Sequence, residues 1–214
     1  KNSTIPKLLI IKTKNFYKNK KNTINNIKNF FSKNEILIVR SSSSEEDSSK
    51  KSNAGAFVTV PNVKNNYIEI HNAITQVIKS YKNKNNSILF VQKMITDCNY
   101  SGVITTCNLN TKAPYYVVSY HDGKNTSVAT SGKAKTKNYF QFKYFKGKGL
   151  KKFSKIIKLA KELEIKFKNN FLDIEFGVKK NKVYLFQVRP IVLKDRVLTI
   201  KRKTFENGLE KLKN

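Results

Sequence analysis

The sequence is poor in tryptophan and cysteine, and it has no long apolar run. There is no tryptophan, and the two cysteines, Cys98 and Cys107, lie nine positions apart. This count and spacing argue against a disulfide framework and against a zinc site with a CxxC pair, so we expect two reduced thiols. No apolar run approaches the roughly 20 residues that a membrane-spanning helix needs, and no signal peptide is visible. We therefore expect a cytoplasmic protein without a membrane span.

Arginine is also scarce, although the chain is strongly basic. Of 43 basic residues 39 are lysines, and the formal net charge is +29. The four arginines are Arg40, Arg189, Arg196 and Arg202. Specific nucleic-acid sites usually rely on arginine for bidentate and stacking contacts, whereas the lysines here are spread along the whole chain. We interpret the charge as a solvated lysine surface, expect no specific nucleic-acid partner, and infer that a guanidinium is needed where arginine does occur.

The sequence does contain alternating helix and strand patterns, which predict an α+β protein. Apolar residues at helical spacing predict helices at 23–31, 67–81 and 150–167. Runs of β-branched and aromatic residues predict strands at 8–12, 35–40, 56–60, 87–94, 101–106, 115–120, 127–130, 139–144, 172–178 and 182–188. We expect two antiparallel sheets with helices packed on them, followed after Pro190 by a strand-like stretch and a short basic helix.

Four polar residues lie in the predicted hairpin at 171–191. Strand side chains alternate between two faces, so Asp173 and Glu175 share a face of one strand, and Gln187 and Arg189 share a face of the other. A turn near residues 180–181 places Glu175 close to Gln187 across the strands, with Arg189 returning to the same face. The apolar neighbours expected on the opposite side are Phe176, Phe186 and Val188.

The residues alone leave two interpretations of this polar group. The first is a structural salt bridge between Arg189 and one of the two carboxylates. The second is a Mg²⁺–phosphate site, in which Glu175 and Gln187 supply oxygens to the metal and Arg189 neutralises phosphate charge. In that case Asp173 would hold Arg189 or a metal-bound water.

Three segments of the chain decide between these interpretations. In chain order they are IVRSSSSEEDSSKKSNAGAFVTV, VQKMITDCNYSGVITT and LDIEFGVKKNKVYLFQVRPI. They resemble the nucleotide-binding domain of the phosphoenolpyruvate synthase and pyruvate phosphate dikinase family, an ATP-grasp fold, over roughly Ile36 to Ile191. Members carry a VRSSA-x-x-ED loop, a VQ-x-M strand followed by SGV, and a closing D-I-E-W/F … L-x-x-L-Q-x-R-P hairpin. The stretch 115–132 is similar to capsule-locus glutamine kinases of the same architecture.

The resemblance implies an ATP-dependent phosphotransferase of the kinase or dikinase type, with ATP and Mg²⁺ as cofactors. It implies that Arg40 and Arg189 act at the phosphates as catalytic residues and that the metal is held by Glu175 and Gln187. The Ser/Glu/Asp segment after Arg40 would form part of a lid. The implied cofactor-binding residues are Arg40, Gly55, Thr59, Gln92, Glu175, Gln187 and Arg189, with Gly55 and Thr59 under the triphosphate and Gln92 near the adenine or ribose. Without the neighbouring match, Gln92 would be interpreted as an ordinary polar strand residue.

Some family features are missing from the sequence. The FTRDP segment of the family appears here as TTCNL at 105–109, the GLGE segment is replaced around 119–123, and no GGK motif is visible upstream of Thr4. Neither His71 nor His121 lies in a carrier-domain motif, so we expect surface or packing roles for both. The resemblance implies a phosphohistidine carrier domain and an acceptor domain as partners, on the same or another polypeptide, and we expect the chain to be a fragment of the full enzyme.

These expectations combine into a domain plan and a function. Residues 1–93 would form the first ATP-grasp subdomain with the phosphate-binding loop, 94–192 the second with the metal-binding hairpin, and 193–214 a C-terminal extension. A nucleotide cleft would lie between the two subdomains. The predicted function is to pass phosphate from ATP to a carrier histidine and then to an acceptor. The alternative is a catalytically inactive polyanion- or nucleotide-binding module that retains the fold.

Overall fold

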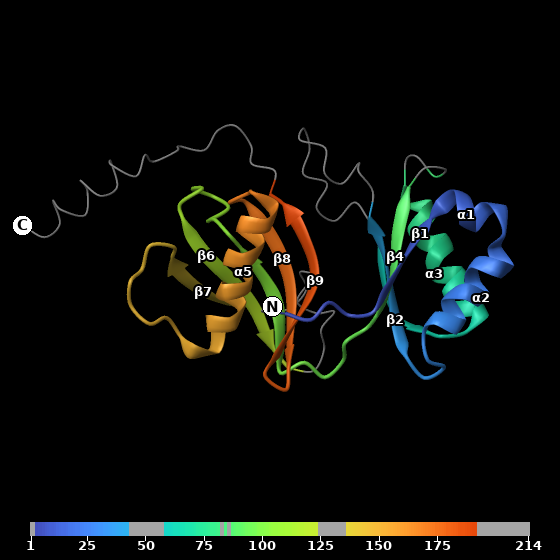
Figure 1. Ribbon diagram of the computed structural model, residues 1–214, viewed down its shortest axis with the longest axis horizontal. Helices are drawn as coiled ribbons and strands as arrows, with labels where there is room; N and C mark the ends of the chain where they lie inside the picture. The colour runs from blue at the N-terminus through green and yellow to red at the C-terminus, as the bar shows by residue number, and fades with distance from the viewer. Residues whose placement is uncertain (1–2, 43–57, 82–83, 85–86, 124–135, 192–214) are drawn as a thin grey trace, which may run out of the picture.

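Two antiparallel sheets, each with helices on one face, form the protein in the computed structural model (Figure 1). The structure describes residues 3–42, 58–81, 84, 87–123 and 136–191. This arrangement confirms the expected α+β class with antiparallel sheets and packed helices. Among the described residues, no helix has the length and apolarity that crossing a bilayer requires.

The first sheet has four strands in the order β1-β4-β2-β3. They are β1 (Leu8–Lys12), β2 (Ile36–Ser42), β3 (Thr59–Lys64) and β4 (Ile88–Lys93). The helices α1 (Thr13–Lys18), α2 (Lys20–Phe30) and α3 (Tyr67–Lys79) pack on one face of this sheet. Their apolar positions, among them Ile24, Ile70 and Ile74, form a core with Leu37 and Val91 of the strands. The opposite face of the sheet is therefore free of helices in the described part of the chain.

The second sheet has five strands in the order β7-β6-β5-β8-β9. They are β5 (Tyr100–Thr105), β6 (Tyr115–Asp122), β7 (Lys137–Phe142), β8 (Leu172–Lys179) and β9 (Lys182–Pro190). A short 3₁₀ turn, η1 (Lys151–Phe153), leads into α5 (Ser154–Phe167), which packs on one face of the sheet. Ile156, Leu159 and Ala160 of α5 meet Ile174 and Phe176 of β8 in this second core.

Most predicted elements appear within a few residues of their expected bounds, and two differ. Helix α1 was not predicted. It buries one apolar side chain, Phe16, so its sequence shows no helical spacing of apolar residues. The strand expected at 56–60 is β3, which continues to Lys64 past Pro61 and Asn62. The pairing register with β2 shifts between Leu37 and Val39, and such a bulge accommodates a proline that cannot donate to the ladder. The strand expected at 127–130 and the elements expected after Pro190 lie outside the described residues.

The two sheets are joined by more than the chain that leads from β4 to β5. The backbone N–H of Thr4 donates to Val183 O (2.9 Å), and Leu185 N–H donates to Thr4 O (3.0 Å), so the segment before β1 pairs with β9, the edge strand of the second sheet. The chain then continues into β1 of the first sheet. The strands of the first sheet lie between residues 8 and 93 and those of the second between 100 and 190, while the division of the chain at residue 93 stays a prediction.

Candidate functional site

Strand β2 presents Arg40 on the face of the first sheet that the helices do not cover. Leu37 and Val39 lie in the helix-side core, so Ile38 and Arg40 point the other way. Arg40 pairs with Thr59 on β3, and Ile38 pairs with Gln92 on β4. The structure therefore brings Arg40, Thr59 and Gln92 together on one face, which we call the inner face of the first sheet.

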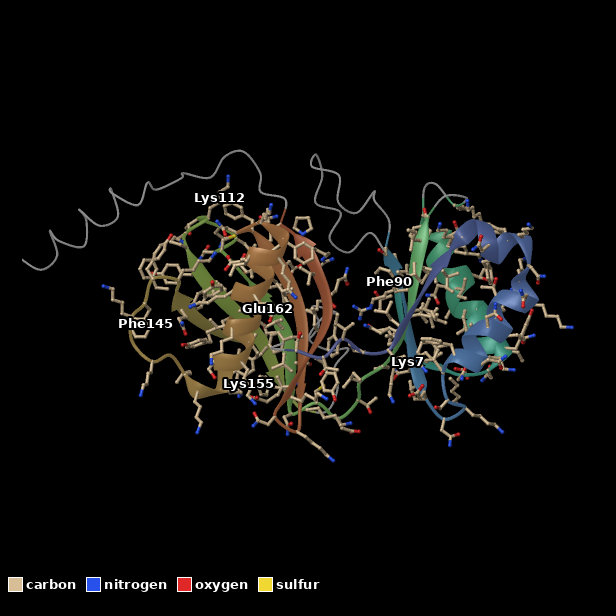
Figure 2. The ribbon with its side chains drawn as sticks, viewed as in Figure 1. Lys7, Phe90, Lys112, Phe145, Lys155 and Glu162 are labelled. Carbon is tan, nitrogen blue, oxygen red and sulfur yellow. The ribbon has the colours of Figure 1, made fainter. Side chains whose placement is uncertain are left out.

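Phe90 marks the same inner face. It lies two residues before Gln92 on β4, between Leu89 and Val91, whose side chains are in the core. Figure 2 shows Phe90 on the side of the first sheet that is turned toward the second sheet. Gln92 is 4% exposed and Thr59 is exposed, so the amide lies deeper than the hydroxyl.

The β8–β9 hairpin presents the four polar residues on the inner face of the second sheet. Leu172 and Ile174 pack toward α5, so Asp173 and Glu175 point away from it. In the register, Glu175 is opposite Gln187 and Asp173 is opposite Arg189. The expectation that Glu175 and Gln187 are cross-strand neighbours, with Arg189 beside them, is thus confirmed.

Arg40 connects the two inner faces. Its Nη1 donates to Glu175 Oε2 at 3.1 Å and to Gln187 Oε1 at 3.2 Å. The side chains of Arg40 and Glu175 are 8% and 11% exposed, so this ion pair is largely buried. The sequence predicted that Arg40 ends a strand; instead β2 continues to Ser42, and Arg40 lies inside it. A buried guanidinium requires a nearby carboxylate, but the burial of Arg40 is known only from the structure, so the sequence did not point to this contact.

Arg189 lies beside this ion pair. Its Nη2 donates to Asp173 Oδ2 at 2.7 Å and is 4.0 Å from Glu175 Oε1. The salt bridge that was the structural interpretation of the hairpin is therefore present, and it involves Asp173. The same contact matches the expectation that Asp173 holds Arg189.

One apolar residue of the hairpin lies on the unexpected face. Phe176 and Val188 pack toward α5 as expected. Phe186 does not, because the pairing register shifts between Glu175 and Phe176 and leaves one extra residue in β9. A Cβ on Gly177, which shares the face of Glu175, would lie 2.6 Å from Phe186 Cζ. The Phe186 ring thus covers Gly177 on the inner face, and the prediction for Phe186 was wrong.

Unpaired polar atoms are concentrated on these inner faces. Within the described ranges, four buried side-chain atoms have no hydrogen-bond partner: Arg40 Nε, Asn65 Oδ1, Ser101 Oγ and Asp173 Oδ1. Three of them lie on the inner faces, since Ser101 pairs with Gly177 in the register and so shares the face of Glu175. Buried polar groups are almost always satisfied in proteins, so an unpaired donor and two further unpaired groups indicate the place of a polar ligand.

The oxygens at this place fit a divalent cation. Glu175 Oε2 and Gln187 Oε1 both accept from the same nitrogen, so they converge on one point. Among the described residues no three His, Cys, Asp or Glu side chains gather as metal ligands. Mg²⁺ needs only one or two protein oxygens when phosphate and water supply the others, so a carboxylate and an amide oxygen suffice.

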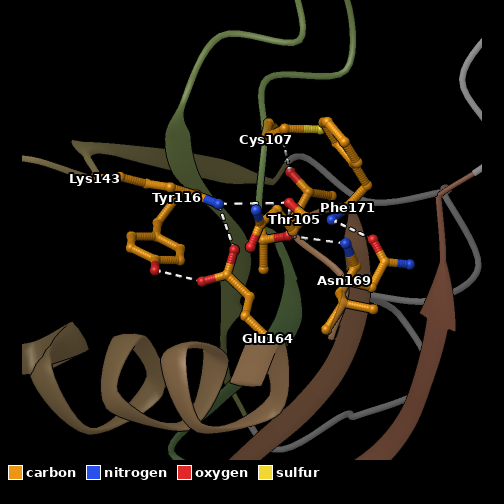
Figure 3. Close-up of polar contacts among 10 residues, drawn as sticks. Thr105, Cys107, Tyr116, Lys143, Glu164, Asn169 and Phe171 are labelled. Carbon is orange, nitrogen blue, oxygen red and sulfur yellow. Dashed lines mark hydrogen bonds and ion pairs between the residues drawn. The ribbon is translucent and has the colours of Figure 1, made fainter. Parts of the chain in front are cut away.

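A second polar cluster lies on the α5 side of the second sheet (Figure 3). Tyr116 Oη donates to Glu164 Oε2 at 2.6 Å, and Lys143 Nζ pairs with Glu164 Oε1. Burial, together with Glu164, raises the pKa of the Tyr116 hydroxyl. A cavity of about 350 Å³ borders these residues and Cys107. Since both Glu164 oxygens are satisfied within the cluster, it ties α5 to β6, and sequence reasoning missed it because Glu164 stands within an apolar helix face.

The remaining predicted residues are a segment that is not described and two histidines, of which His121 shares the inner face of the second sheet through its pairing with Ser101. Gly55 and the Ser/Glu/Asp segment at 43–57 lie outside the described residues. His71 stacks on Tyr67, with ring centroids 6.3 Å apart, and contacts Phe16, which supports a packing role. His121 lies on β6 opposite Ser101.

Comparison with known proteins finds likeness only among solved structures. No protein-family model matches the sequence, and no curated protein matches it. D-alanine–D-alanine ligase from Helicobacter pylori is similar at 15% identity and a TM-score of 0.49, over 98% of this chain and 55% of that one. D-alanyl-alanine synthetase A from Vibrio cholerae is similar at 14% identity and a TM-score of 0.47, over 98% of this chain and 56% of that one. Macrocyclase MdnC from Microcystis aeruginosa, bound with precursor peptide MdnA, is similar at 13% identity and a TM-score of 0.42, over 90% of this chain and 48% of that one. The chain spans about half the length of these structures.

Proposed function

We propose that this chain is the ATP-binding domain of an ATP-grasp phosphotransferase, which holds ATP and Mg²⁺ between the inner faces of its two sheets. One observation carries the proposal. Arg40 of the first sheet meets Glu175 and Gln187 of the second within 3.2 Å, beside buried atoms that lack partners. A cation donor, two converging oxygens and unpaired polar atoms are the groups that a metal–polyphosphate requires.

Each residue of the site has a part in this proposal. Arg40 and Arg189 bind and neutralise the phosphates, and Glu175 and Gln187 hold the metal, which screens phosphate charge when bound. Thr59 lies on the phosphate side, next to Arg40 in the register, and Gln92 contacts the adenine or ribose. Gly55 is placed beneath the triphosphate by the sequence resemblance alone. Catalysis by such a site is positioning and charge neutralisation, without a protein nucleophile in this chain.

The acceptor of the phosphate is proposed to lie elsewhere. By resemblance to the phosphoenolpyruvate synthase and pyruvate phosphate dikinase family, the phosphate passes to a histidine on a carrier domain and then to an acceptor. The packing of His71 against two aromatic rings argues against His71 as that carrier.

The test is ATP binding by calorimetry, with and without Mg²⁺, in the wild type, Glu175→Gln and Gln187→Ala. We expect Mg²⁺ to strengthen ATP binding in the wild type at least about tenfold, because a charge-assisted contact contributes about 1.5–3 kcal/mol. Both variants should lose this metal-dependent gain and keep at least the metal-independent affinity. Glu162→Gln is the matched control, since it makes the same chemical change on the outer side of α5 (Figure 2).

Two outcomes would contradict the proposal in different ways. If Mg²⁺ strengthens ATP binding equally in all four proteins, the metal is not held by the hairpin. If the wild type binds no ATP with or without Mg²⁺, the chain is not an ATP-binding domain.

A further inference from the structure

Arg40 occupies the position that a cation held by Glu175 and Gln187 would take. Both oxygens accept from its Nη1, at 3.1 and 3.2 Å. A Mg²⁺ ion lies about 2.1 Å from its oxygen ligands. An ion bound by the same two oxygens would therefore overlap the guanidinium or lie in repulsive contact with it.

We propose that Glu175 and Gln187 accept a divalent cation only together with a polyphosphate, because Arg40 excludes the free ion until phosphate draws its guanidinium away. This inference rests on the proposed function and names the true ligand of the site, the metal–nucleotide complex. Free metal and metal-free nucleotide are each poor ligands for the same reason: either one leaves a buried charge without a partner.

Because Arg40 stays charged, it excludes the free cation until a phosphate binds to the guanidinium. A guanidinium does not lose its proton in proteins, so it cannot yield to a cation by becoming neutral, as a lysine could. The ion pair is shielded from solvent, with side chains 8% and 11% exposed, so the repulsion between Arg40 and an incoming ion is weakly screened.

Phosphate supplies the partner that Arg40 needs. Arg40 Nε is buried and has no hydrogen-bond partner among the described residues. A phosphate can accept from Nε and an Nη atom together, which satisfies that donor and replaces both contacts that Arg40 gives up. Arg189 remains on Asp173 at 2.7 Å, so it does not fill the place that Arg40 leaves.

The exchange also changes what joins the two sheets. Without ligand, the Arg40–Glu175 ion pair connects β2 to β8. With ligand, the connection runs from Arg40 through phosphate and metal to Glu175. Each half of the site then holds the ligand by a charge of its own.

The test measures Mn²⁺ binding by equilibrium dialysis, in the absence of nucleotide, to the wild type, Arg40→Gln and the double variant Arg40→Gln/Glu175→Gln. We expect Arg40→Gln to bind one Mn²⁺ per chain at least about tenfold more tightly than the wild type, because a unit positive charge next to the ion has been removed. The double variant should lose this gain. Addition of ATP should bring Mn²⁺ to the wild type.

A matched control separates exclusion by Arg40 from a general loss of positive charge. Lys143→Met removes another partly buried cation that is paired with a carboxylate, Glu164, on the α5 side of the second sheet. We expect no gain in Mn²⁺ affinity from this variant, since Glu164 stays hydrogen-bonded to the Tyr116 hydroxyl and the other group that Lys143 leaves is the neutral Asn170 carbonyl, 3.4 Å from its Nζ. An equal gain in Lys143→Met and Arg40→Gln would overturn the proposal.

Two further results would overturn it. In the first, the Arg40→Gln variant is folded but binds Mn²⁺ no more tightly than the wild type. In the second, the nucleotide-free wild type binds Mn²⁺ tightly, and the substitution Glu175→Gln abolishes this binding. Failure of the wild type to bind ATP, with the Mn²⁺ gain of Arg40→Gln intact, would refute the proposed function and leave the competition between Arg40 and the cation established.

Discussion

At the scale of the residue, burial decides which side chains are chemically available. Arg40 was expected to face a cleft, yet only 7% of the residue is exposed, and its contacts with Glu175 and Gln187 keep it in place. The residue types at the site were predictable, because Arg, Glu and Gln at these spacings are rare in an otherwise apolar strand. Their direct contact was not predictable, because Arg40 and Glu175 are 135 positions apart in the sequence.

The two cysteines give a prediction at this scale. Cys98 and Cys107 are each 1% exposed, burial raises the pKa of the Cys98 thiol to about 11, and burial also raises the pKa of Cys107. A raised thiol pKa means that the reactive thiolate is scarce at about pH 8 and forms only as the pH approaches the shifted value. We therefore expect neither thiol to react with a disulfide reagent in the folded protein at about pH 8, and both to react in denaturant.

Lys158→Cys is the control for accessibility, because Lys158 is exposed on α5. Its thiol should react at once under the same conditions. Labelling of Cys98 or Cys107 at the rate of this control would show that burial does not protect them.

At the scale of the element, regular periodicity was predictable and irregularity was not. Helices α3 and α5 follow from apolar residues spaced at three and four positions, and β8 follows from strict alternation. The bulge in β9 that turns Phe186 to the inner face leaves no mark in the sequence, because Phe186 and Leu185 are both apolar. Likewise the strand expected at 56–60 continues past Pro61, which the irregular pairing of β2 with β3 accommodates.

The end of α5 gives a prediction at this scale. Lys168 caps the helix in the left-handed conformation (φ 50, ψ 38), which a side chain with a Cβ disfavours. Lys168→Gly should therefore raise the free energy of unfolding by about 0.5–1 kcal/mol, measured by urea denaturation, because glycine adopts this conformation without that penalty.

The same substitution within the helix should have the opposite sign. Lys158→Gly places glycine in the helical region of α5 and should lower the free energy of unfolding by about 1 kcal/mol. A loss of stability of similar size in both variants would show that the left-handed cap is not strained.

At the scale of the whole molecule, the class of fold was predictable and the contact between the sheets was not. Two sheets with helices on one face each follow from the order of elements along the chain. Among the described residues, the polar contacts that join the sheets include those of Arg40 with Glu175 and Gln187 and those of Thr4 with the edge of β9. Neither contact leaves a pattern in the nearby sequence. A motif resemblance could therefore name the residues of the site but could not give the distances between them.

The net charge of +29 gives the prediction at this scale. If the lysines form a solvated surface, a DNA oligonucleotide should bind only through its phosphates and lose about 10³-fold or more in affinity between ~0.05 and ~0.2 M salt. Binding of ATP with Mg²⁺ should change less than about tenfold over the same range, because its charges are held in a largely buried site. Gel-shift and calorimetric titrations measure the two.

The comparison also separates the two functions considered from the sequence. Oligonucleotide binding that survives ~0.5 M salt would point to a specific nucleic-acid site. Loss of ATP at the same steep rate as DNA would point to a polyanion-binding surface in place of a nucleotide site.

The pairing of Thr4 with β9 has a consequence for the order in which the protein is built. Thr4 can pair with Val183 and Leu185 only after both have left the ribosome, and nearly all of the described residues are synthesised between Thr4 and these two. Domains form as units during synthesis, and the four strands of the first sheet are complete by Lys93. The first sheet can therefore assemble before the segment that precedes β1 meets its partner, and Thr4 pairs with the edge of β9 only after the β8–β9 hairpin has been made.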